Sequence, residues 1–215
     1  MQLRSVLFDF DGVIADTEPR YADFFRAELS GTGMDVEEFV RSVRGTPLKR
    51  MMEIWFKDWD EARRQALVER QVDFELHGMR YDYVPGAREL LDSLKARGIA
   101  MALVTSSHKR KMAVALKVMG LEGFFDTVVT AEDITRGKPD PMCYLLAAER
   151  LGARREECII FEDSLAGLTA ARRAGIRGIG LSTSHSPEEL AGYADEVIPD
   201  FTDTERVEGF LQGRG

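Results

Sequence analysis

The alternation of apolar and polar stretches after residue 85 is the most regular pattern in the chain. Short apolar runs of strand length recur there, and between them lie longer segments whose apolar positions repeat at helical spacing. The predicted strands are 99–104, 126–129, 158–161, 177–181 and 196–198, and the predicted helices are 86–97, 109–119, 140–152, 165–174, 187–192 and 203–212. Strands and helices that alternate at this rhythm indicate a parallel sheet with helices on both faces.

Another apolar run, residues 6–10, lies near the N-terminus and contains Asp9, with Asp11 just beyond it. Nearly continuous apolar sequence is typical of a parallel strand that is buried on both faces. Side chains two residues apart in an extended chain point to the same side, so the two carboxylates would lie together. Buried like charges repel each other unless a cation lies between them. We therefore expect these acids to serve chemistry; the alternative is a solvated turn after an edge strand.

Residues 17–82 break the alternation because they contain only helix-like segments. These segments are 19–29, 35–44, 47–57 and 60–77. A helical block inserted after the first strand is typical of a lid, and it would leave the core beside Asp9 and Asp11, at the strand end where open parallel sheets bind ligands. The sequence therefore predicts an α/β fold, with a Rossmann-like core formed by 1–16 and 83–215 and an inserted helical-bundle cap.

Composition narrows the class of partner. The chain has 215 residues, a formal net charge of −8 and a pI near 5.1, which argue against a nucleic-acid-binding surface. Its apolar stretches are shorter than the roughly 18 residues of a membrane helix, so we expect neither a membrane span nor a signal peptide. Cys143 and Cys158 lack metal-binding spacing, which favours reduced thiols in a cytoplasmic protein.

Polar side chains stand at the predicted carboxyl ends of three later strands. They are Thr105, Ser106 and Ser107 after 99–104, Lys138 in the loop after 126–129, and Glu162 and Asp163 after 158–161. Carboxylates suit a hard cation such as Mg²⁺, which prefers a few oxygen ligands together with a substrate phosphate. The lysine and the threonine suit the phosphate itself.

At these positions the chain resembles the haloacid dehalogenase superfamily, specifically its phosphatases and phosphomutases with a small helical cap. The matching motifs are Asp9-Phe10-Asp11-Gly12-Val13, Thr105, Lys138 within Gly-Lys-Pro-Asp-Pro, and Glu162-Asp163-Ser164 within Phe-Glu-Asp-Ser-Leu-Ala-Gly. They stand in the family's order at strand ends, and the resemblance covers nearly the whole chain. Asp11, two residues after Asp9, argues against the dehalogenases themselves, which are similar but need no Mg²⁺.

The resemblance implies a Mg²⁺-dependent phosphatase in which Asp9 attacks phosphorus and forms an aspartyl-phosphate. Asp11 would protonate the leaving alcohol and then deprotonate the attacking water. Mg²⁺ would be held by Asp9, the backbone carbonyl of Asp11 and Asp163. Glu162 would bind the metal, directly or through water, or brace the motif lysine. The residues that bind the transferring phosphate would be Thr105, Ser106 and Lys138.

Two cap positions favour a phosphatase over a mutase. The mutases that resemble this chain carry a histidine where Tyr21 stands, and an arginine for a distal phosphate where Leu48 stands. We therefore expect a cytoplasmic monomer that hydrolyses a small phosphomonoester such as a sugar phosphate. The alternatives are a β-phosphoglucomutase-type phosphomutase that uses Arg20, Arg44, Lys49 or Arg50 instead, a non-catalytic phosphate-binding regulator, and a phosphonate hydrolase with Lys49 or Lys57 as its cap lysine.

Residues beside these motifs also have simpler structural interpretations. Thr105–Ser107 could cap the helix that begins near Lys109, which is compatible with phosphate binding. The basic run 109–111 is interpreted as a solvated helix start, which near a phosphate site could also steer anions. His108 follows the threonine motif and could reach a substrate, but the structural interpretation is favoured.

Overall fold

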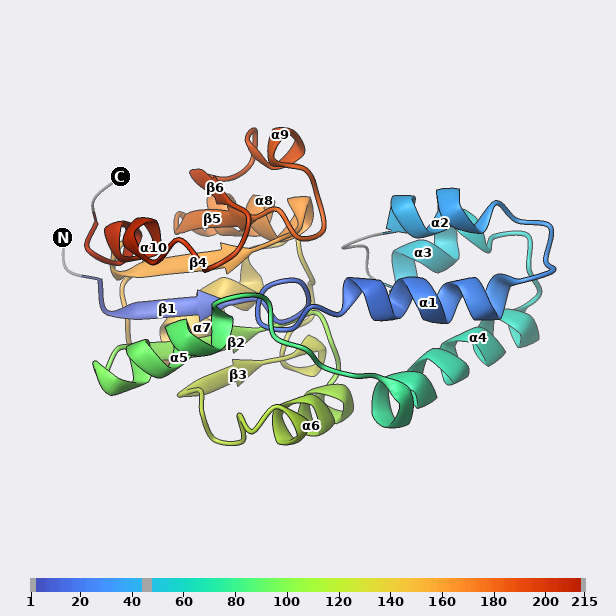
Figure 1. The fold of residues 1–215 in the computed structure, drawn as a ribbon, viewed down its shortest axis with the longest axis horizontal. Coiled ribbons are helices and arrows are strands. Elements are labelled where there is room, and N and C mark those ends of the chain that lie inside the picture. Colours follow the sequence, from blue (N-terminus) through green and yellow to red (C-terminus); the bar gives the residue numbers. More distant parts are fainter. Residues whose placement is uncertain (1–2, 44–47, 214–215) are drawn as a thin grey trace.

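A six-stranded, fully parallel sheet forms the centre of the protein in the computed structural model, which describes residues 3–43 and 48–213 without the side chains of residues 48–50 (Figure 1). The strands are β1 (Ser5–Phe8), β2 (Ala100–Val104), β3 (Thr127–Val129), β4 (Cys158–Glu162), β5 (Arg177–Leu181) and β6 (Glu196–Ile198). Their order across the sheet is β3-β2-β1-β4-β5-β6. The predicted α/β fold with a Rossmann-like parallel sheet is therefore confirmed.

Helices cover both faces of this sheet, as the periodicity predicts. They are α5 (Ala87–Ala96), α6 (Lys109–Val118), α7 (Met142–Arg150), α8 (Leu165–Ala174), α9 (Pro187–Leu190) and α10 (Thr204–Leu211). Successive strand residues point to opposite faces: Val6 and Phe8 pack with α5, α6 and α10, whereas Leu7 packs with α7 and α8. Burial on both faces explains why the strands lack a polar alternation.

Between β1 and α5 the chain forms a separate group of helices, seen to the right of the sheet in Figure 1. They are α1 (Glu18–Leu29), α2 (Val36–Val43), α3 (Leu48–Trp55) and α4 (Glu61–Asp73). This group, called the lid below, has its own apolar core, in which Phe25, Phe39 and Phe56 are buried. The position of its limits at residues 16–17 and 82–83 stays a prediction.

The two chain segments that connect the lid to the core run side by side. Asp16 donates a backbone hydrogen bond to Asp82, and Val84 donates one to Ile14. After α4 the predicted helix 60–77 does not end regularly, because its last turn, Phe74–Gly78, is π-helical. Such turns are rare and occur frequently at functional sites.

The sheet order reverses direction at β1, which has β2 on one side and β4 on the other. Ligands of open parallel sheets bind outside the carboxyl ends of the strands at such a reversal. The lid leaves the core at this edge, so the fold brings lid and strand ends together (Figure 1). Within the described residues, no helix is both long enough and apolar enough to span a membrane.

Candidate active site

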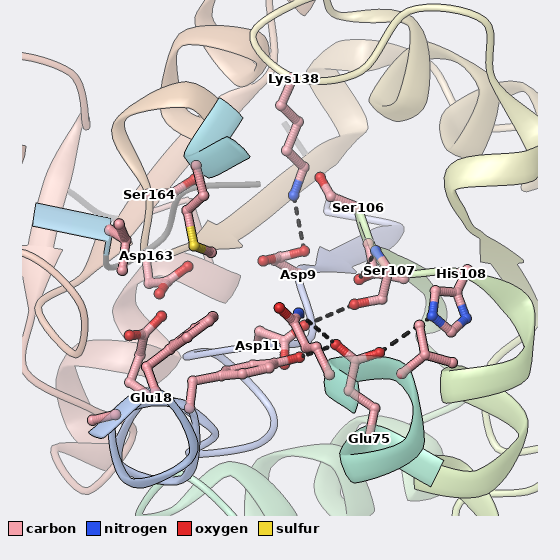
Figure 2. A pocket seen from close by; sticks show the side chains of 18 of the residues that line it. Asp9, Asp11, Glu18, Glu75, Ser106, Ser107, His108, Lys138, Asp163 and Ser164 are labelled. Atoms are coloured by element: carbon pink, nitrogen blue, oxygen red, sulfur yellow. Dashed lines mark hydrogen bonds and ion pairs between the residues drawn. The ribbon is translucent and has the colours of Figure 1, made fainter. Parts of the chain in front are cut away.

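A cavity of about 290 Å³ lies between the carboxyl ends of the central strands and the lid (Figure 2). All the acids and the lysine that the sequence assigns to the site line it except Glu162, which is fully buried behind it. The lining residues from the core are Asp9, Asp11, Thr105, Ser106, Ser107, His108, Lys138, Asp163 and Ser164. Residues more than 150 positions apart in the chain therefore share one small space, as the strand-end argument predicts.

Lys138 joins two of the buried acids. Its Nζ donates to Asp9 Oδ1 at 2.8 Å, the contact drawn in Figure 2, and to Glu162 Oε2 at 2.7 Å. Glu162 also accepts hydrogen bonds from Tyr144 Oη and Ser164 Oγ. Burial opposes ionisation of Glu162, but Lys138 and these hydrogen bonds hold the pKa of its carboxyl below the ordinary value. The lysine is thus fixed between the first acid and a buried carboxylate.

Asp9, Glu162 and Asp163 form a buried cluster in which one carboxylate oxygen from each lies within 4.8 Å of the others. Burial raises the pKa of Asp9 to about 7, and burial with the neighbouring carboxylates raises the pKa of Asp163 well above its ordinary value. Carboxyl groups this close oppose one another's ionisation, and a divalent cation between them would remove that repulsion; their hard oxygen donors are those that Mg²⁺ prefers. The residues present therefore fit a divalent cation.

Gly12 is required where the chain turns off β1. Its φ is +74°, a conformation that side chains rarely adopt, and an added Cβ would collide with the carboxylate of Asp163. Gly12, which follows Asp9 and Asp11, thus lets the backbone pass directly against the carboxylate of Asp163.

Asp11 is held by side chains that the motifs do not include. Lys111 Nζ lies 2.7 Å from each carboxylate oxygen, Thr17 Oγ1 donates to Oδ1 at 2.7 Å, and Ser107 Oγ donates to Oδ2 at 3.0 Å. Burial opposes ionisation, but Lys111 and the two hydroxyls hold the pKa of Asp11 below its ordinary value. The interpretation of Lys111 as part of a solvated helix start is wrong, because its side chain is only 1% exposed.

Capping of α6 also differs from expectation. The N-cap is His108, whose side chain accepts from the backbone of Lys111, so Thr105–Ser107 do not cap the helix. Thr105 Oγ1 instead accepts from the backbone N–H of Ser107. Thr105 is buried, while Ser106 is exposed at the cavity.

The lid contributes a largely apolar wall with one polar group of residues. The lid residues that line the cavity are Glu18, Tyr21, Ala22, Phe25, Val40, Val43, Met51, Val68, Gln71, Val72 and Glu75. Glu75, on the π-helical turn, accepts from Tyr21 Oη at 2.8 Å and from Gln71 Nε2 at 3.0 Å. Its other oxygen lies 3.2 Å from His108 Nε2, so His108 faces the lid across the cavity (Figure 2).

Comparison with known proteins assigns the family. The family model described as haloacid dehalogenase-like hydrolase matches residues 6–181. The chain belongs to this family. The haloacid dehalogenase-like hydrolase described here is 34% identical over 91% of its length to the whole of a phosphorylated carbohydrates phosphatase of Thermotoga maritima.

Two further relatives are similar over most of the chain. A validoxylamine A 7'-phosphate phosphatase of Streptomyces hygroscopicus is 32% identical over 92% of this chain and 93% of its own. A Thermotoga maritima structure provisionally named a β-phosphoglucomutase has a TM-score of 0.75 and 31% identity, covering 97% of this hydrolase and 99% of that chain. The similar proteins thus include two named as phosphatases and one provisionally named as a mutase.

The motifs of this haloacid dehalogenase-like hydrolase identify the residues at the strand ends but not their supports. No motif includes Lys111, Glu75 or Tyr144. Of these three, Lys111 could have been found from the helical spacing, because it lies four residues before Ala115 and therefore on the buried face of α6. Of the two cap positions on which the prediction of a phosphatase rests, Tyr21 faces the cavity, whereas the side chain of Leu48 lies outside the described residues.

Proposed function

We propose that this hydrolase is a Mg²⁺-dependent phosphatase that hydrolyses a small phosphomonoester, specifically a sugar phosphate. The observation that carries the proposal is the buried cluster of Asp9, Glu162 and Asp163 with Lys138 bonded to two of the three acids, at the strand ends and beneath the lid. The acids suit a bound cation and the lysine suits a bound phosphate. A site for the cation alone would not need the lysine, and a site for the phosphate alone would not need the acids.

Asp9 is the proposed nucleophile. A carboxylate oxygen of Asp9 attacks phosphorus, the bond from phosphorus to the ester oxygen breaks, and an aspartyl-phosphate forms. Asp11, which lines the same cavity, must take up a proton before it can protonate the departing alkoxide, because its contacts favour the carboxylate; as the carboxylate it then takes a proton from the water that releases phosphate. Lys138, already 2.8 Å from Asp9, lies close enough to pair with the transferring phosphate as well.

Proposed ligands of Mg²⁺ are the carboxylates of Asp9 and Asp163 and the backbone carbonyl of Asp11, with Glu162 close by. When bound, the cation neutralises negative charge on the phosphoryl group. Thr105 and Ser106, which line the cavity at the end of β2, are proposed to bind phosphate oxygens through the hydroxyl and the backbone amide.

The lid residues that line the cavity indicate which kind of substrate it would accept. The cavity of about 290 Å³ has the size of a small-molecule site. Among the described lid residues that line it, the charged ones are both acidic, Glu18 and Glu75, and the others are mostly apolar. Such a wall favours an uncharged leaving group with hydroxyls over one with a second phosphate. The Thermotoga maritima relative is named for phosphorylated carbohydrates, which supports a sugar phosphate.

The proposal is tested by measuring phosphate release from a panel of hexose, pentose and hexitol monophosphates, with Mg²⁺ and with excess chelator. We expect release that requires Mg²⁺ and is greater for monophosphates than for bisphosphates. Conversion of glucose 1-phosphate into glucose 6-phosphate with a bisphosphate primer would favour the mutase instead. Phosphate binding without any turnover across the panel would favour the regulator.

A further inference from the structure

Lys111 is a buried cation whose contacts all lie at the site, although no motif includes it. Its side chain is 1% exposed. A buried ammonium is costly unless it is paired and hydrogen-bonded, and this one donates to Asp11, Ser107 and Tyr21. Packing alone would be served better by an apolar side chain at this position of α6, since Met112 and Ala115 beside it are buried.

We propose that Lys111 is a positioning residue that orients the carboxylate of Asp11. The hydroxyl of Tyr21, which accepts a hydrogen bond from Lys111, holds Lys111 in place from the lid. The inference rests on the proposed function, because the orientation of Asp11 matters if it moves protons. Lys111 touches neither the cation cluster nor Lys138 in any contact described, so it acts on the reaction through Asp11.

The bond directions support this role. Lys111 can only donate, so the Tyr21 oxygen accepts from it at 2.8 Å and the Tyr21 hydroxyl is left to donate to Glu75 Oε1. Ser107 behaves in the same way, since it accepts from Lys111 at 2.9 Å and donates to Asp11 at 3.0 Å. The hydrogens of both hydroxyls are thereby assigned, and the three hydrogens of Lys111 are shared among four acceptor atoms, two of them the oxygens of Asp11. These contacts hold Asp11 in one orientation.

The network also connects two lid elements to the core. Tyr21 lies on α1, where the chain enters the lid, and Glu75 lies on the π-helical turn, where it leaves. Glu75 contacts His108 at the start of α6, three residues before Lys111. The hydrogen bond from Lys111 to Tyr21 therefore requires that the lid pack against the core as it does here. In that arrangement Lys111 is held on both sides and orients Asp11.

Lys111→Met tests the assignment, because methionine keeps the length of the side chain and removes the ammonium. We expect kcat to fall about 100-fold, within the range of general acid–base catalysis, while KM changes by less than about threefold. The matched control is Lys109→Met on the same helix, whose side chain is 60% exposed, and it should keep wild-type kinetics. An unchanged kcat in Lys111→Met would overturn the proposal.

A double-mutant cycle separates positioning from general damage to the fold. If Lys111 acts through Asp11, then Lys111→Met added to Asp11→Asn should slow turnover no further than Asp11→Asn alone. Full multiplication of the two effects would contradict the assignment. Should Lys111→Met fail to fold, Tyr21→Phe decides, because it removes one hydroxyl from the network and keeps the ring. Its kcat should fall about tenfold with KM nearly unchanged.

A crystal structure of Lys111→Met, or of Tyr21→Phe if the former does not fold, separates failure of this inference from failure of the proposed function. If the wild-type protein turned over no phosphomonoester, the proposed function would be refuted. The positioning role would still predict that the side chain of Asp11 leaves its wild-type orientation in the variant. An Asp11 that stays in place would refute the positioning role, whatever the activity of the wild-type protein.

Discussion

Replacing Tyr144 by phenylalanine tests the buried support of the site. Tyr144 is fully buried on α7, and its hydroxyl donates to Glu162, which is itself fully buried and bonded to Lys138. Phenylalanine keeps the ring in its apolar surroundings and removes one hydrogen bond to a charged acceptor. Such a bond contributes about 1.5–3 kcal/mol to the free energy of unfolding.

The expected shift can be measured by urea unfolding. With an m-value of roughly 3 kcal/mol/M, as suits a chain at the upper end of small proteins, the midpoint should fall by about 0.5–1 M urea. Far-UV circular dichroism is the proper probe, because both tryptophans, Trp55 and Trp59, lie in the lid and would report its unfolding.

Tyr193→Phe is the matched control, since Tyr193 is 42% exposed and its substitution should leave the midpoint unchanged. An unchanged midpoint in Tyr144→Phe would refute the reasoning, because it would mean that the hydroxyl contributes nothing to holding Glu162.

Two further predictions concern groups away from the cation cluster. Burial raises the pKa of Cys143 and Cys158 to about 11, so about 100-fold less thiolate is present than for an unshifted thiol, and Ellman's reagent should modify both only after unfolding. Burial opposes ionisation of Asp133, but Thr130 and Arg150 hold its pKa below the ordinary value. This stabilisation is full above the unfolded pKa and is lost as pH falls toward the folded one. Urea titrations should therefore show the stability advantage of wild type over Asp133→Asn shrinking below about pH 4; an advantage independent of pH would contradict it.

The sheet could be predicted from the sequence because its determinants are local. Apolar runs such as 99–104 and 158–161 are buried on both faces, and their lengths and the helices between them leave few arrangements other than a parallel sheet. The carboxyl ends of parallel strands meet at one edge, so the acids at residues 9, 11 and 163 could be placed together from the sequence.

The supports of the site could not be predicted, because they depend on how the lid sits on the core. Tyr21 and Glu75 are 54 positions apart and meet only through the packing of α1 against the π-helical turn. Lys111 lies in a basic run that by composition indicates a solvated surface, and only its place on α6 brings it to Asp11. Contacts of this kind are set by tertiary packing, which local sequence patterns do not specify.

The claim that Asp9 is the nucleophile is tested most directly by trapping phosphate on the protein. Wild-type enzyme mixed with Mg²⁺ and a ³²P-labelled sugar phosphate, then quenched in acid, should carry a hydroxylamine-sensitive label on the peptide that contains Asp9. Asp9→Asn should fold normally, carry no label and release no phosphate. Turnover retained in Asp9→Asn, or a label on another peptide, would contradict the account.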